Sequence, residues 1–165
     1  MTLASAGWSV VDVEPCPDCD VATVKGVCPS CGAFVFTVPA ASKMLTANRA
    51  GSDRYARGRV VQEWQANTRQ ALRAFRIPPF TERAEIVTSW HGTKNVRRDG
   101  ANSYPTVKAI IDAMVKEGVL ADDDHAHLYG PIMLVGRKRH AATITVAIRR
   151  HIPRRTIMTE HEVPW

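Results

Sequence analysis

The pattern of apolar and polar positions predicts alternating strands and helices in the first half of the chain. Residues 32–42 (GAFVFTVPAAS) alternate apolar residues, which predicts a strand that ends at Pro39. Residues 54–75 carry apolar side chains at near-helical spacing and stop before a Pro-Pro pair, which predicts a helix. Residues 84–90 (AEIVTSW) then predict a second strand.

The second half contains the strongest helical pattern, in residues 105–120 (PTVKAIIDAMVKEGVL). Pro105 suits a first helical turn and Gly118 suits a helix end. One face of this helix would be apolar, formed by Val107, Ile110, Ile111, Met114 and Val115. Two β-branched or apolar runs follow, joined by the basic turn 136–140, and they predict an antiparallel hairpin.

The element order is therefore β-α-β-α-β-β, which predicts an α+β domain with two main helices on a mixed β-sheet. We assign this domain to residues 34–150. A small cysteine-containing module, residues 1–33, would precede it. Residues 151–165 form a polar, proline-interrupted tail.

Charge and composition narrow the function. The chain has 165 residues, is 45% hydrophobic and carries a formal net charge of +6, which suits a polyanionic partner such as nucleic acid. No stretch approaches the roughly 20 apolar residues that span a bilayer. The first residues also lack the charged start and apolar run of a signal peptide. These features predict a reducing cytoplasm as the compartment and no membrane partner.

All four cysteines lie in two Cys-x-x-Cys pairs, which are Cys16, Cys19, Cys28 and Cys31. Each pair forms a tight turn that presents two thiolates, and two such turns complete a tetrahedral zinc site. Two disulfides or a redox pair are the alternatives. A reducing compartment disfavours disulfides, and redox chemistry needs only one pair. We therefore predict a structural zinc ion that supplies the folding energy of a short module.

A second group of residues could support phosphodiester chemistry. Asp99 and Asn102 precede the second helix, Lys108 lies inside it, and the aspartate run 122–124 follows it. Carboxylates are ligands for Mg²⁺ or Mn²⁺, and a nearby lysine can stabilise charge that develops on a phosphate. The basic side chains expected to hold the DNA backbone are Arg97, Arg98, Arg137, Lys138 and Arg139.

Simpler interpretations exist for each of these residues. Asp99 before a glycine is a common turn residue, Lys108 could pair with Asp112 four residues later, and the aspartate run could be a solvated loop. The two ends of a long helix are also too far apart for one metal site. A shared site requires that the aspartate loop fold back along the helix, or that a second subunit contribute residues.

Residues 97–130 (RRDGANSYPTVKAIIDAMVKEGVLADDDHAHLYG) resemble the RusA family of Holliday junction resolvases, which occur in phages and bacterial prophages. In that family an Asp-x-Asp-Asn element leads into a helix with a lysine, and a Gly-Val-x-x-Asp-Asp turn follows. The resemblance extends over roughly residues 34–150. It implies a Mg²⁺-dependent homodimer that nicks two strands of a four-way DNA junction symmetrically, in a bacterial or phage-infected cytoplasm.

By this resemblance, Asp99 and Asn102 match the first element, Lys108 matches the catalytic lysine, and Asp123 matches the metal-binding aspartate. Asp122 would be the partner of Asp123. The resemblance thus implies catalytic roles for these three aspartates and Lys108, with the aspartates as magnesium ligands.

The chain departs from the family pattern in two ways. Ala101 stands where the family has its second aspartate, and the segment from Asn102 to Lys108 is about three residues longer. Asp124 or His125 is a candidate replacement for the missing ligand. Two other functions therefore remain open, which are a zinc-containing protein that binds junctions without cleaving them and a small zinc-ribbon regulator.

Overall fold

The computed structural model describes residues 15–47, 54–95 and 97–153. The predicted order of elements is confirmed, with one additional short 3₁₀ helix, η2, before the second long helix. The elements are β1 (Phe34–Pro39), α1 (Arg54–Ala74), β2 (Ala84–His91), η2 (Gly100–Ser103), α2 (Tyr104–Lys116), β3 (Leu128–Val135) and β4 (Thr143–Arg150). The prediction of an α+β protein with a mixed sheet and two main helices is also confirmed.

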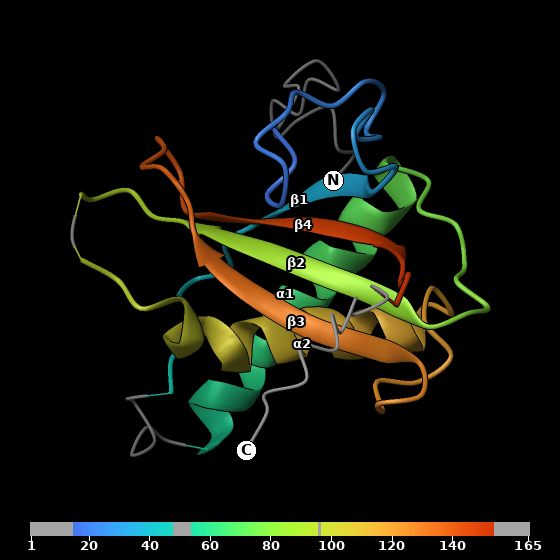
Figure 1. Cartoon of the computed structure of the whole chain (residues 1–165). Coiled ribbons are helices and arrows are strands. Elements are labelled where there is room, and N and C mark those ends of the chain that lie inside the picture. The colour runs from blue at the N-terminus through green and yellow to red at the C-terminus, as the bar shows by residue number, and fades with distance from the viewer. Residues whose placement is uncertain (1–14, 48–53, 96, 154–165) are drawn as a thin grey trace, which may run out of the picture.

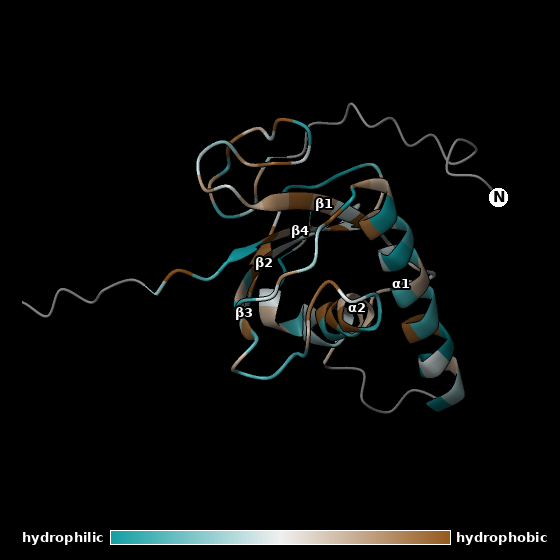
Figure 2. Cartoon of the chain, turned by 90° about the vertical axis from the view of Figure 1, so that its right-hand side faces the viewer, coloured by the Kyte–Doolittle hydropathy of each residue, from teal (hydrophilic) through white to brown (hydrophobic). Residues whose placement is uncertain are grey.

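The four strands form one mixed sheet in the order β1-β4-β2-β3. β4 pairs antiparallel with both β1 and β2, whereas β2 and β3 are parallel and are joined through α2. Figures 1 and 2 show α1 and α2 together on one side of this sheet. Because β2 and β3 run in the same direction, the loops that follow them emerge at the same end of the sheet.

The predicted hairpin between the last two strands was wrong. β3 and β4 do not pair with each other, because β2 lies between them. The basic connection 136–142 crosses the end of β2 instead of closing a tight turn. Alternation of side chains determines which face a strand buries, but it does not determine which neighbour the strand pairs with. Two apolar runs joined by a short basic segment therefore suggested a hairpin that the sheet does not contain.

The main core lies between the sheet and the helices. Trp64 of α1 is fully buried, and so are Phe36 and Ile148 of the sheet. Ile86 of the sheet is 1% exposed. From α2, the buried apolar residues include Val107, Ile110, Ile111 and Met114, so the predicted apolar face of this helix is confirmed. Alternate residues of the strands point to the opposite face of the sheet, which the cysteine module partly covers.

The end of α2 sets the direction of the aspartate loop. Gly118 has a φ of 73°, a conformation in which most other residues are strained. Its N–H donates to the carbonyl of Val115, and the N–H of Val119 donates to the carbonyl of Met114 at 2.9 Å. This paired arrangement is a Schellman motif, which reverses the chain at a helix end. The loop after Gly118 therefore returns along α2 instead of continuing away from it.

The segment between β1 and α1 is tied to α2 by one buried threonine. Thr106, which is fully buried, accepts a hydrogen bond from the N–H of Leu45 at 2.9 Å and donates one to the carbonyl of Leu45 at 2.8 Å. We expect Thr106→Val to lower the free energy of unfolding by about 2 kcal/mol, because it leaves two buried backbone groups unpaired. Urea unfolding measures this, with Thr93→Val at an exposed position as the control. Equal stability of both variants would contradict it.

Candidate functional site

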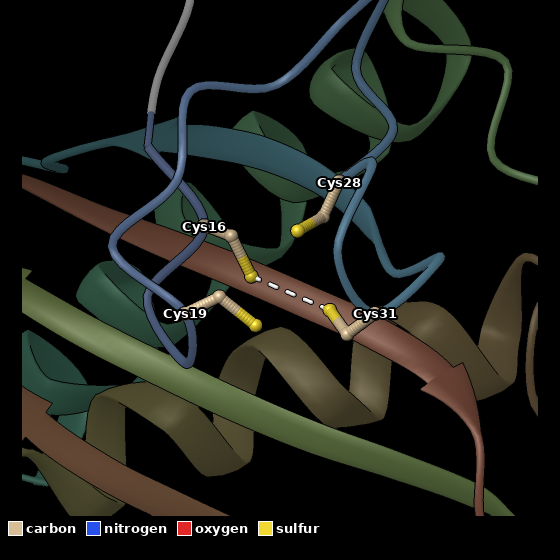
Figure 3. A group of neighbouring side chains, drawn as sticks. All are labelled: Cys16, Cys19, Cys28 and Cys31. Carbon is tan, nitrogen blue, oxygen red and sulfur yellow. Dashed lines mark hydrogen bonds between the residues drawn. The ribbon is translucent and has the colours of Figure 1, made fainter.

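The four cysteines lie on two equivalent turns. The N–H of Asp20 donates to the carbonyl of Cys16 at 2.8 Å, and the N–H of Gly32 donates to the carbonyl of Cys28 at 2.8 Å. Asp20 and Gly32 both have positive φ, at 51° and 69°, and close the two turns in the same way. Each Cys-x-x-Cys pair is thus held by the backbone with its two thiols on the same side (Figure 3).

The sulfur atoms fit a tetrahedral metal ion. All four Sγ atoms lie within 4.8 Å of one another, and the Sγ atoms of Cys16 and Cys31 are 3.8 Å apart. A zinc ion with Zn–S bonds of about 2.3 Å requires S–S separations of about 3.8 Å. A disulfide requires about 2.05 Å, and all four cysteines are free. The predicted cluster is confirmed as a group that could hold a structural metal ion such as zinc.

The surroundings of the thiols differ between the two pairs. Burial raises the pKa of Cys16 to about 12, despite hydrogen bonds from the backbone of the same turn. Burial also acts to raise the pKa of Cys31, but hydrogen bonds from the Ala33 N–H, from other cysteines and from Arg149 outweigh it and lower the value to about 7. The Cys31 thiol is therefore more easily converted to a thiolate ligand than the Cys16 thiol.

The module packs on the face of the sheet opposite the helices. Cys16, Cys28 and Ala33 form a small apolar cluster with Val35, Val87 and Ala147 of the sheet. Beside this cluster, Arg149 of β4 contacts Asp18 of the first turn at 2.8 Å and Glu85 of β2 at 2.9 Å. Arg149 thus links the first cysteine turn to the two central strands through charged contacts.

The second candidate site is centred on Lys108. Its Nζ atom donates to Asp112 Oδ1 at 2.5 Å and also pairs with Asp123 Oδ2. The contact with Asp112 confirms the pairing along the helix that the sequence suggested. The contact with Asp123 shows that the aspartate loop does fold back along α2. Two carboxylates therefore meet at one lysine beside a pocket of about 340 Å³ that Arg57 and Tyr104 also line.

These contacts fix the charges of the site. Burial acts to lower the pKa of Lys108, but its hydrogen bonds and charge interactions with Asp112 and Asp123 outweigh it and raise the pKa above the usual range. Lys108 in turn lowers the pKa of Asp123 below its ordinary value. At neutral pH the lysine is a cation and Asp123 is a carboxylate, as the predicted phosphodiester chemistry needs.

The other predicted aspartates make local contacts. Asp99 is exposed and accepts a hydrogen bond from the Ala101 N–H at 3.0 Å at the start of η2. Asp122 accepts one from the Asp123 N–H at 2.7 Å, and Asp124 contacts His127 at 2.7 Å. Within residues 15–47, 54–95 and 97–153, the four cysteines are the only group of three or more His, Cys, Asp or Glu side chains that could hold a metal ion. Asp99, Asp122 and Asp123 thus form no ready-made cluster in one chain, and magnesium binding stays a prediction.

The predicted DNA-binding residues lie on two loops at one end of the sheet. Arg97 and Arg98 follow β2, whereas residues 137–139 follow the parallel neighbour β3. The Arg139 N–H donates to the Gly92 carbonyl at 3.0 Å, so the two loops are in contact. Arg98 packs over the Trp90 ring at 5.5 Å. Asn102 is partly buried near this end, and its carbonyl accepts from the Ala47 N–H.

Two contacts near the candidate sites were missed by reasoning from sequence. The Arg149 link to the cysteine turns joins residues too distant along the chain for any pattern to indicate. The ion pair between Arg137 and Asp20, at 3.5 Å, depends on the same packing. Asp112 was considered only as a simple helix partner of Lys108, although its spacing already placed a second carboxylate at that lysine.

No family model matches the chain, and no curated protein matches it significantly. Among the helices of the described residues, none has the length and apolar character needed to cross a membrane.

Proposed function

We propose that this protein is a Mg²⁺-dependent or Mn²⁺-dependent endonuclease of the RusA type, which nicks four-way DNA junctions symmetrically as a homodimer. The observation that carries the proposal is the contact between Lys108 and Asp123. It joins the two halves of the lysine-helix-acidic-turn motif, which are separated by the last two turns of α2 and the following loop. The Schellman motif at Gly118 returns the loop along α2, and Asp123 is the carboxylate of the loop that contacts Lys108.

The residues of this site suit hydrolysis of a phosphodiester. A bound Mg²⁺ would polarise the phosphate and activate water, with Asp123 as a ligand and Asp99 and Asp122 as the further ligands that the resemblance implies. Lys108 would stabilise the negative charge that develops on the phosphate oxygens. Because Lys108 is held by two carboxylates, its ammonium group has a fixed position before any substrate binds.

The basic loops support DNA as the substrate. Arg97 and residues 137–139 extend from one end of the sheet and add to a net charge of +6. Contacts of this kind position a nucleic acid through its backbone and carry no sequence information. Recognition of a branched shape would then come from the arrangement of two subunits, since a four-way junction and a homodimer both have two-fold symmetry.

The cysteine module supports the same function indirectly. We infer that it holds a structural Zn²⁺, because a closed set of four thiolates leaves no open position for substrate. Its packing on Val35, Val87 and Ala147 covers an apolar part of the sheet. The metal would thus stabilise the domain that presents Lys108 and the basic loops.

The test is cleavage of a labelled synthetic four-way junction by zinc-loaded protein in Mg²⁺, with a linear duplex of the same sequence as the control. Paired nicks in opposite strands of the junction, and none in the duplex, are expected. No cleavage of any branched DNA in either Mg²⁺ or Mn²⁺ would contradict the proposal.

A second candidate is a protein that binds junctions without cleaving them. It is favoured by Ala101 at the position of an expected ligand and by the use of Asp99 as a local cap of η2. This candidate predicts junction affinity with a steep salt dependence and no nicks. It also predicts that Asp123→Asn does not weaken binding, because removal of a negative charge from a DNA-binding surface favours the complex.

A further inference from the structure

A pocket of about 420 Å³ lies between the first cysteine turn and the loop that joins β3 to β4. Ser89 and His91 of β2 line it, together with Pro15 and Pro17 of the module. The loop contributes three consecutive basic residues, Arg137, Lys138 and Arg139. The pocket is on the face of the sheet that carries the cysteine module, so it is separate from the Lys108 site beside α2.

The loop that carries these cations has a fixed backbone. The Gly136 N–H donates to the Trp90 carbonyl at 2.9 Å, and the Arg137 carbonyl contacts His91 Nδ1 at 2.9 Å. The backbone of Gly136 also approaches Ser89 and His91 so closely that a Cβ atom there would collide with both. The basic residues are therefore presented from a rigid edge of the pocket, which lowers the cost of ordering them on a ligand.

One acidic side chain faces this basic edge. Among the described residues that line the pocket, Asp20 is the only one with a carboxylate, and its Oδ2 atom lies 3.5 Å from Nη2 of Arg137. Both side chains are well exposed, Arg137 at 91% and Asp20 at 76%. An ion pair this exposed contributes little stability. A phosphate can replace it, because phosphate can accept two parallel hydrogen bonds from the guanidinium group, whereas Asp20 makes one contact of 3.5 Å.

The exposure of the cations indicates an extended ligand rather than a small one. A site for a small molecule encloses its ligand and keeps its few charged groups inside. Here the charges are at the rim, and the second basic loop, with Lys94 and Arg97 exposed, lies beside them. Contacts of this kind are typical of proteins that follow a nucleic-acid backbone.

We propose that this pocket binds a backbone phosphate of DNA through Arg137 and Lys138, and that Asp20 pairs with Arg137 until the phosphate replaces it. The proposal rests on the proposed function only in taking DNA as the polyanion. It assigns the cysteine module a second role, because the turn that holds the metal also positions Asp20. The Asp20 N–H bonds to the Cys16 carbonyl at 2.8 Å.

The test is binding of a labelled linear duplex, measured by fluorescence anisotropy over a range of salt concentrations without Mg²⁺, so that cleavage plays no part. The double variant Arg137→Gln with Lys138→Gln is expected to bind more weakly. The slope of log affinity against log salt should become shallower by about 0.9, because the double variant loses the contact with one phosphate. The matched control is Lys25→Gln with Arg76→Gln, which removes two charges from exposed positions and should leave the slope nearly unchanged.

The Asp20→Asn variant should change the duplex affinity in the opposite direction. Because misfolding would weaken binding, tighter binding by this variant excludes misfolding as the cause. Asn is among the few residues that adopt positive φ readily, so the backbone at Asp20, with φ of 51°, is retained. We expect several-fold tighter duplex binding by Asp20→Asn. Glu82→Gln, another exposed acidic residue, serves as the control for the lost charge.

Four outcomes bear on the proposal. Unchanged affinity and slope in the Arg137→Gln, Lys138→Gln variant would overturn it, even if the wild type cleaves junctions. Equal tightening by Asp20→Asn and Glu82→Gln would also overturn it, since the effect would then reflect net charge. Release of the duplex by inorganic phosphate, but not by sulfate at equal ionic strength, would indicate a small-anion site instead. The expected changes in a protein that never nicks a junction would support the pocket and contradict only the nuclease.

Discussion

Lys108→Met and Asp123→Asn are each expected to reduce the rate of junction nicking by about 10²-fold or more, because each removes a group that acts directly on the reacting phosphate. Lys108 supplies the fixed cation, and Asp123 supplies a ligand for Mg²⁺. The measurement is the single-turnover nicking rate of a labelled four-way junction at saturating protein. Saturation separates the effect on chemistry from any effect on binding.

Two control variants test whether the effect is specific to this site. Lys116 lies two turns after Lys108 on α2 and contacts Gln65 at 2.9 Å, so Lys116→Met removes the same charge from the same helix. Asp124 is the exposed neighbour of Asp123 and contacts His127. Lys116→Met and Asp124→Asn should nick at rates within a few-fold of the wild type. If Asp124→Asn were as inactive as Asp123→Asn, Asp124 would be the replacement for the ligand missing at Ala101. Wild-type activity of Asp123→Asn would show that the assignment of Asp123 as a ligand is wrong.

The elements of the fold were predictable because their signals are local. Pro105, the apolar positions of α2 and Gly118 lie within one short segment, and each has a direct physical effect on a helix start, face or end. Pairing between strands has no such signal. The position of β4 between β1 and β2 depends on which apolar surfaces fit together over the whole domain, so the hairpin was predicted in error.

The candidate sites were likewise predictable where their signals are local along the chain and not where they depend on tertiary packing. The cysteine cluster was predictable because ligand type and spacing are both local. The sequence left open whether the aspartate loop folds back along α2 or a second subunit contributes residues, because Gly118 indicates the helix end but not which residue of the loop reaches Lys108. The contacts of Arg149 with Asp18 and Glu85 join three separate segments. Such contacts form only once the sheet and the module are packed, and nothing in the sequence indicates them.

Loss of the zinc ion that we propose for the cysteine cluster is expected to have the largest effect on stability. In the Cys31→Ser variant only three thiolates remain, and we expect the module to lose the ion and to separate from the sheet. Val35 and Val87, each 2% exposed, would then meet water. Burial of one such side chain contributes about 1.5–3 kcal/mol, so the free energy of unfolding should fall by about 3–6 kcal/mol. Thermal unfolding followed by circular dichroism measures the change.

The metal content distinguishes this explanation from the alternatives. Wild-type protein purified under reducing conditions should contain one zinc ion per chain and release four free thiols when it is unfolded with a chelator. Lys25→Gln, an exposed substitution in the same module, should retain both the metal and the stability. A wild type without zinc, whose stability is the same with and without chelator, would show that the cysteines do not form a metal site. The described part of the module would then be held by the packing of Cys16 and Cys28 on the sheet, by the backbone hydrogen bonds of the two turns and by the contact of Arg149 with Asp18.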